Sequence, residues 1–178
     1  MSKEKLIKFI NDNEISLGIA NQKTELKKSK NIGHGRFATE DILPNEIIYR
    51  AGGLWLTEKE RNGYSKDYFQ LVENAWHFQG GLKFHLNGCH NHSCDPNAYC
   101  QEYVIRALRK INKGEEITVD YAAFIYHNYT IIEKCNCGSK NCRKIILGND
   151  WKNYNLPKKY NYKVNGHILE MWLQDQQS

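Results

Sequence analysis

The sequence has 178 residues, of which 40% are hydrophobic and 12% aromatic, and 25 Lys and Arg against 20 Asp and Glu give it a formal charge of +5. This length fits one domain with a hydrophobic core, whereas no apolar run reaches the ~20 residues of a membrane span and the N-terminus lacks the apolar segment of a signal peptide. We therefore expect an intracellular protein without membrane contact, and direct nucleic-acid binding is not expected because the basic residues form no concentrated stripe.

The N-terminal half of the chain predicts one amphipathic helix followed by short strands. Ser2 can cap this helix, which is predicted at residues 2–14. Its apolar face would consist of Leu6, Phe9 and Ile10, at three- and four-residue spacing. Short strands are predicted at residues 15–20, 25–29, 46–50 and 54–56.

Two glycines stand on either side of His34 in the stretch 31–38. Glycine permits a positive φ and lets backbone amides approach a ligand closely, so Gly33 and Gly35 indicate either a hairpin turn or a backbone contact with a ligand. The hairpin turn is the simpler of these two interpretations. A dinucleotide-binding fingerprint is excluded, because it requires a third glycine and a βαβ unit.

The C-terminal half predicts two longer strands, at residues 98–108 and 115–121, with a turn at Gly114 between them. Asn165 is predicted to cap a last helix. The apolar face of this helix would consist of Ile168, Leu169, Trp172 and Leu173. Short strands joined by turns, with helices at the edges, predict a mainly β fold with peripheral helices.

The cysteine positions indicate a metal site. In a reducing compartment, six cysteines favour metal binding or reactive thiols over disulfides. Cys135, Cys137 and Cys142 lie within eight residues of one another, and Gly138 permits the backbone to reverse between them. A structural zinc ion takes four ligands in a tetrahedron. These thiols therefore require a fourth ligand from elsewhere in the chain.

Residues 89–100 (CHNHSCDPNAYC) offer several candidates for the fourth ligand. The Asp-Pro-Asn sequence in this stretch is typical of a tight turn, which holds neighbouring side chains in fixed directions. Cys94 is the natural donor, and with this ligand the metal would fasten the late cysteine segment over residues 91–92 as one wall of a pocket. The alternative fourth ligands are Cys89, His90 and Cys100. Taken alone, the stretch also fits a polar loop with a buried thiol.

Four segments, taken together, resemble the SET-domain protein lysine methyltransferases that carry a post-SET zinc segment. These are residues 33–38 (GHGRFA), 91–97 (NHSCDPN), 114–121 (GEEITVDY) and the Cys-x-Cys-x4-Cys sequence at 135–142. They follow one another in the family's order. The resemblance implies a β-clip-like fold with small curled sheets, a pseudoknot formed by the threaded C-terminal segment, and a zinc-bound post-SET segment.

The resemblance also implies a division of the chain into four parts, as in compact microbial members of the family. They are an N-terminal helical extension at 1–25, a SET domain at 26–130, a post-SET zinc segment at 131–148 and a C-terminal extension with a helix at 149–178. The expected protein is a monomer. It would be cytoplasmic, or nuclear if its substrate is a histone.

The family transfers methyl groups from S-adenosylmethionine to the side-chain amine of a protein lysine, for example in a histone tail. By this resemblance Tyr121 is the catalytic residue. The residues implied for the cofactor are Gly33, His34, Gly35, Tyr68, Asn91 and His92. The residues implied for a structural zinc ion are Cys94, Cys135, Cys137 and Cys142.

The chemistry of methyl transfer accounts for these residue types. The attacking lysine amine must be neutral although its free pKa is ~10.4, and a narrow apolar channel lowers that pKa by desolvation. A phenol is mostly neutral at pH 7. We therefore expect Tyr121 to orient the amine and stabilise charge rather than to act as a standing anionic base.

The sequence departs from the family pattern at positions that affect the product and the substrate. Val119, two residues before Tyr121, stands where Phe or Tyr is common, and its smaller side chain predicts a dimethyl or trimethyl product. Residues 88–90 (GCH) replace the usual Arg-Phe-x. The alternative function is a catalytically silent module that binds a lysine-bearing protein tail, and a zinc-clipped nucleic-acid binder is a more distant one.

Overall fold

A computed structural model of the chain describes residues 18–30, 33–51, 54–56, 69–72, 75–78, 90–101, 104–125 and 129–177, and at 51, 54–56, 69–72 and 75–78 it describes the backbone alone. The helix predicted at residues 2–14 lies outside the described residues, as do Tyr68 and Cys89. The chain divides into two compact units, Met1–Ala20 with Tyr49–Gly88 and Asn21–Ile48 with Cys89–Ser178.

The first unit contains short antiparallel strands. Its elements are β1 (Gly18–Ala20), the end of β4 (Ile47–Ala51), β5 (Leu54–Leu56), β6 (Phe69–Val72) and β7 (Ala75–Phe78). β1 pairs with β4, and β5, β7 and β6 form a sheet in that order. Gly18 has a φ of 129°, and a Cβ atom there would lie 2.1 Å from the Tyr49 hydroxyl. Glycine is therefore required where β1 crosses the Tyr49 ring.

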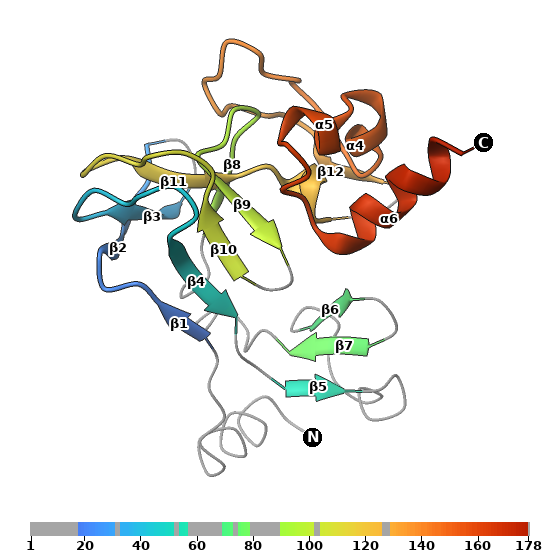
Figure 1. Cartoon of the computed structure of the whole chain (residues 1–178). Helices are drawn as coiled ribbons and strands as arrows, with labels where there is room; N and C mark the ends of the chain where they lie inside the picture. Colours follow the sequence, from blue (N-terminus) through green and yellow to red (C-terminus); the bar gives the residue numbers. More distant parts are fainter. Residues whose placement is uncertain are drawn as a thin grey trace. The chain divides into compact units, whose positions relative to one another are not determined.

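The second unit is organised around a sheet that joins segments from both halves of the chain. Its strands are β2 (Thr24–Lys28), β3 (His34–Ala38), β8 (Asn91–His92) and β11 (Glu116–Val119), in the order β2-β3-β11-β8. β2 and β3 form the predicted hairpin, from Thr24↔Ala38 to Lys28↔His34. β8 runs parallel to β11, with Asn91 opposite Thr118 and His92 opposite Val119. Residues 91–92 and 116–119 therefore lie side by side (Figure 1).

One predicted strand is wrong. Residues 98–108 form a hairpin of β9 (Ala98–Gln101) and β10 (Val104–Ala107), with Val104 opposite Gln101. The sequence between the two strands, Glu-Tyr, contains none of the Gly, Pro, Asn or Asp residues that normally mark a turn. The two strands were therefore predicted as one, because no turn residue separates them.

The C-terminal part adds short helices to this β structure. Its elements are η3 (Tyr121–Ala123), β12 (Thr130–Ile132), β13 (Ile146–Leu147), α4 (Asp150–Asn153), α5 (Leu156–Lys159) and α6 (Gly166–Asp175). Asn165 caps α6 as predicted, because its side chain accepts from the His167 N–H. Ile168 and Trp172 are buried, but Leu173 is 48% exposed. The prediction that Leu173 belongs to the apolar face is wrong. Each residue turns an α-helix by about 100°, so the side chain that follows the buried Trp172 points away from the core.

The helices and the late cysteines share one hydrophobic core. α4, α5 and α6 lie beside β12 (Figure 1). Their buried cluster consists of Cys94, Ala122, Ala123, Cys135, Ile146, Trp151, Leu156, Tyr160, Val164, Ile168 and Trp172. The expected fold class, mainly β with peripheral helices, is confirmed. In the part of the chain that the structure describes, no helix has the length and apolar character needed to cross a membrane.

Candidate active site and metal centre

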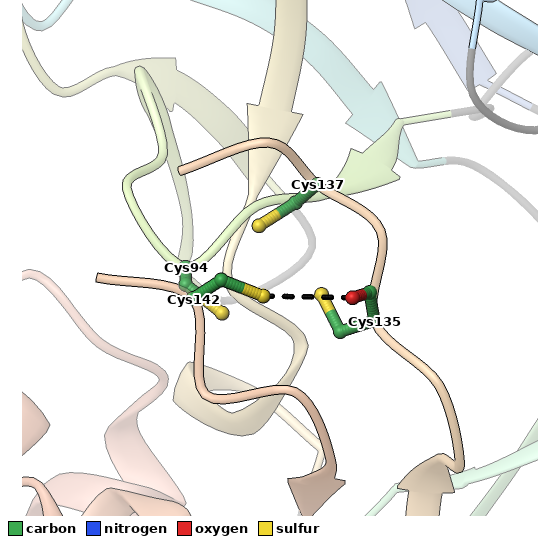
Figure 2. A group of neighbouring side chains, drawn as sticks. All are labelled: Cys94, Cys135, Cys137 and Cys142. Carbon is green, nitrogen blue, oxygen red and sulfur yellow. Dashed lines mark hydrogen bonds between the residues drawn. The ribbon is translucent and has the colours of Figure 1, made fainter. Parts of the chain in front are cut away.

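Four thiols from two distant segments gather at one point (Figure 2). Cys94 comes from the loop after β8, and Cys135, Cys137 and Cys142 come from the segment between β12 and β13. Their sulfur atoms all lie within 4.8 Å of one another. Tetrahedral zinc with Zn–S distances of about 2.3 Å places its sulfur ligands about 3.8 Å apart. The cluster therefore fits a zinc ion after small adjustments.

Among the described residues, the positions of the side chains show which candidate lies close enough to be the fourth metal ligand. Cys94 joins the cluster, whereas His90 and Cys100 do not belong to it. Burial raises the pKa of the Cys94 thiol, although the backbone N–H of Arg143 donates to its sulfur across 3.3 Å and lowers that pKa. A metal ion must displace protons from such buried thiols, so metal affinity should rise with pH.

The Gly-x-Gly turn lies against Asn91. The Asn91 amide Nδ2 donates to the His34 carbonyl at 3.3 Å and to Glu116 Oε1 at 2.6 Å. The other oxygen of Glu116 accepts from the Ser29 hydroxyl at 2.9 Å. A Cβ atom on Gly35 would lie 2.2 Å from Glu116 Oε1 and 3.0 Å from Asn91 Nδ2. Gly35 is therefore needed for this close packing.

Replacement of Gly35 by alanine is expected to lower the free energy of unfolding by about 1–3 kcal/mol, as overpacking does. The Glu116 carboxylate cannot move aside without losing its hydrogen bonds to Ser29 and Asn91. Urea unfolding measures the change. Gly114→Asn is the control, because nothing lies within 4 Å of a Cβ at Gly114 and asparagine tolerates its φ of 87°. Equal stability of Gly35→Ala and the parent chain would contradict the packing argument.

A pocket with a volume of about 270 Å³ lies between β8, β11 and the late cysteine segment. Asn91 and His92 line it from β8, and Cys135 and Cys137 line it from the cysteine segment. The predicted metal site thus forms one wall of a pocket, as expected. Lining residues that were not predicted include Ser29, Arg109, Glu115, Glu116 and Asn136. Glu116 could have been predicted as a pocket residue, because it places a carboxylate within a strand of the 114–121 motif.

Tyr121 begins η3 and is held at both its backbone and its hydroxyl. Its N–H donates to His92 Nδ1 at 3.2 Å, and its hydroxyl donates to the His90 carbonyl at 3.0 Å. The Tyr121 ring lies 5.3 Å from the His92 ring and 5.8 Å from the Phe124 ring, measured between centroids. The phenol therefore has a defined position next to the Asn-His strand.

His92 is a neutral imidazole at pH 7. Burial lowers its pKa to about 4, although the nearby Asp120 carboxylate acts in the opposite direction. Because Nδ1 accepts from the Tyr121 N–H, the proton is assigned to Nε2. Nε2 lies 3.3 Å from Cys94 Sγ, which suits an N–H donor facing a sulfur acceptor. One ring thus joins the four-thiol cluster to the backbone of Tyr121.

The structure brings most of the predicted residues into two adjoining groups. Gly35 and the backbone of His34 lie next to Asn91, and the His34 side chain is exposed. Gly33 has a φ of 48° and accepts from the Ser29 N–H at 3.0 Å in the hairpin turn. The second group consists of His92, Tyr121, Cys94, Cys135, Cys137 and Cys142.

Residues 33–122, half of the chain, match the family described as "SET domain". The "Histone-lysine N-methyltransferase, H3 lysine-36 specific" of Saccharomyces cerevisiae is 33% identical over 138 residues, which cover 68% of this chain and 19% of the relative. The protein of the same description from Candida glabrata is 32% identical over 170 residues, which cover 80% of this chain and 24% of the relative. The chain thus spans about a quarter or less of the length of these relatives.

Among solved structures, KRYPTONITE in complex with mCHG DNA and SAH is similar in fold. The TM-score is 0.51 at 22% sequence identity, and the match covers 68% of this chain and 28% of that chain. At this identity the likeness bears on the fold alone. The arrangement of short sheets described above is thus shared with a solved protein.

Proposed function

The chain belongs to the SET-domain family, and from this membership we propose that it transfers methyl groups from S-adenosylmethionine to the side-chain amine of a protein lysine. The observation that carries the proposal is the position of Tyr121, whose backbone and ring adjoin His92 beside the four-thiol cluster. Relatives described as histone-lysine N-methyltransferases support a histone as one candidate substrate. A nuclear location and a monomeric state belong to the same proposal.

The proposed cofactor residues lie on β8 and on the hairpin beside it. When bound, S-adenosylmethionine supplies a sulfonium methyl group that is already activated toward a nucleophile. Asn91 and His92 line the pocket, and Gly33, His34 and Gly35 would contribute backbone groups next to Asn91. Tyr68 is proposed as a further contact on the strength of the resemblance. These residues would align donor and acceptor, which is the main contribution of a protein to such a transfer.

Tyr121 would act on the lysine side of the reaction. Its hydroxyl donates to the His90 carbonyl, and a phenol oxygen is also a hydrogen-bond acceptor, so it would accept from an incoming amine. The amine must lose its proton before attack, and an apolar surrounding favours the neutral form. The Tyr121 phenol would then orient the amine toward the methyl group.

The four thiols would hold a structural zinc ion. Cys94, Cys135, Cys137 and Cys142 supply the four sulfur ligands of a closed site without a position for substrate. Because Cys135 and Cys137 also line the pocket, the ion would fix that wall. The role of the metal would be to order the segment, since metal binding supplies folding free energy.

Val119 gives an expectation about the product. Its side chain is buried at 1% exposure, and the residue lies opposite His92 in the parallel strand pair. A side chain of this size leaves room for a dimethyl or trimethyl lysine. We expect Val119→Phe to fill that room and to shift the product toward monomethyl, as read by mass spectrometry of the modified peptide. A parent enzyme that makes monomethyl product alone would contradict the expectation.

The proposed function is tested with labelled S-adenosylmethionine, a histone mixture and a crude proteome, followed by mapping of the labelled sites. Label on lysine in the presence of the chain is the expected result. Absence of transfer, together with binding of lysine-bearing peptides, would favour the silent binding module instead. Strong binding of nucleic acid that weakens with salt, in the absence of cofactor, would favour the nucleic-acid binder.

A further inference from the structure

A segment beyond the last cysteine reaches the residue that precedes Tyr121. Tyr160, which follows α5, donates its hydroxyl to Oδ2 of Asp120 across 2.8 Å. Both residues are buried, with Tyr160 6% and Asp120 2% exposed. Burial and the Asp120 charge raise the pKa of Tyr160, so its hydroxyl keeps the proton that it donates. At this depth a water molecule cannot readily take the place of the phenol as a donor.

The other carboxylate oxygen of Asp120 is held by two more donors. Oδ1 accepts from Arg143 Nη2 at 2.5 Å and from the backbone N–H of Ala122 at 3.2 Å. The second of these contacts caps η3, the short helix that begins with Tyr121. A carboxylate bound at both oxygens cannot rotate without breaking a buried, charge-assisted hydrogen bond. The orientation of Asp120 is therefore coupled to the start of η3.

Tyr121 follows Asp120 directly and shares a peptide plane with it. That plane carries the N–H that donates to His92 Nδ1 at 3.2 Å. A rotation of the Asp120 backbone would therefore turn the N–H away from His92. It would also displace the Tyr121 hydroxyl, which donates to the His90 carbonyl at 3.0 Å.

The same C-terminal segment makes two more polar contacts in this region. The Asn165 N–H donates to the Ala123 carbonyl at 3.0 Å, at the other end of η3. Lys159 Nζ donates to the Cys94 carbonyl at 3.0 Å, in the loop that supplies a thiol to the cluster. Residues 159–165 thus contact both ends of η3 and the loop that carries Cys94.

We propose that Tyr160 is a positioning residue for the phenol of Tyr121 and that it acts through Asp120. The consequence for rate rests on the proposed methyl transfer, whereas the consequence for the position of Tyr121 does not. Catalytic groups must be held to within about 0.5 Å, and a misplacement of 1 Å can cost about 100-fold in rate. The C-terminal segment therefore forms part of the site rather than an appendage to it.

Tyr160→Phe tests the proposal, because it keeps the ring in the buried cluster and removes the donor. We expect kcat to fall about 10- to 100-fold, with the KM for cofactor changed by less than about threefold and the zinc content unchanged. Tyr162→Phe is the matched control, since Tyr162 is 47% exposed and keeps its ring contact with Trp172 in the variant. In a Tyr121→Phe background, Tyr160→Phe should cause no further loss, because both changes act on one group.

A readout that does not depend on catalysis is the ¹⁹F NMR signal of 3-fluorotyrosine placed at position 121 of the full chain. Tyr160→Phe should shift or split this signal, and Tyr162→Phe should leave it unchanged. An unmoved signal in Tyr160→Phe overturns the proposal whatever the rate. A parent chain without methyl transfer refutes the proposed function alone, and the ¹⁹F signal then decides the positioning role. If Tyr160→Phe does not fold, Asp120→Asn breaks the same link from its other side and is judged by the same signal.

Discussion

Replacement of Tyr121 by phenylalanine is expected to lower kcat for methyl transfer by at least about 100-fold, or about 2.7 kcal/mol in the activation free energy. The variant keeps the ring and its contacts with His92 and Phe124. It removes the hydroxyl that the His90 carbonyl holds in place. A single-turnover assay with saturating labelled cofactor measures the change, because this assay reports the chemical step.

Two measurements separate a catalytic role of Tyr121 from a structural one. Cofactor affinity by calorimetry should be the same in Tyr121→Phe and the parent, because the proposed cofactor residues are retained. Tyr129→Phe is the matched control and should keep full activity, since Tyr129 is 57% exposed. Activity above a tenth of the parent value in Tyr121→Phe would reject the assignment of Tyr121 as the catalytic residue.

Replacement of Cys94 by serine is expected to remove the bound zinc and to lower the free energy of unfolding by on the order of 4 kcal/mol, as loss of a structural metal does. Cys94 is the one ligand that comes from the β8–β9 loop, so its loss separates that loop from the late cysteine segment. Zinc per chain is measured by elemental analysis of the purified protein. Thermal unfolding in the same buffer measures the stability.

Cys100→Ser is the control for this experiment. Cys100 is a half-buried cysteine in β9 that does not belong to the cluster, so the variant should keep its zinc and its melting temperature. Chelation of zinc from the parent protein should reproduce the loss of stability seen in Cys94→Ser. A parent protein that purifies without zinc, and whose stability does not respond to added zinc, would reject the metal site.

The four-thiol cluster could be predicted because the geometry of a metal site is constrained by chemistry. Three thiols at Cys135, Cys137 and Cys142 leave a tetrahedral ion one ligand short, and few residues in 89–100 could complete it. The choice among Cys94, His90 and Cys100 required the structure, because spacing along the chain does not fix distance across a fold. The proposal of Tyr121 as the catalytic residue comes from the family resemblance and not from periodicity.

Other features of the structure could not be predicted, because no local sequence pattern indicates them. The Tyr160–Asp120 hydrogen bond joins residues 40 positions apart, and each residue by itself fits an ordinary core or surface position. α4 and α5 are single turns of four residues, too short for a 3.6-residue period to emerge. Asn155 separates the two helices in a left-handed conformation, with a φ of 47°. In the sequence it is one polar residue among several, so this conformation could not be predicted.

The buried cluster that joins Cys94 and Cys135 to Trp172 sets an order of events during synthesis. A ribosome releases the chain from its N-terminal end, so the Cys94 loop emerges long before the residues that cover it. A nascent chain that has reached Cys142 still lacks Leu156, Val164, Ile168 and Trp172, which pack in one buried cluster with Cys94 and Cys135 in the folded chain. The proposed methyl transfer would therefore require translation to pass residue 172, and we expect products of earlier termination to be inert.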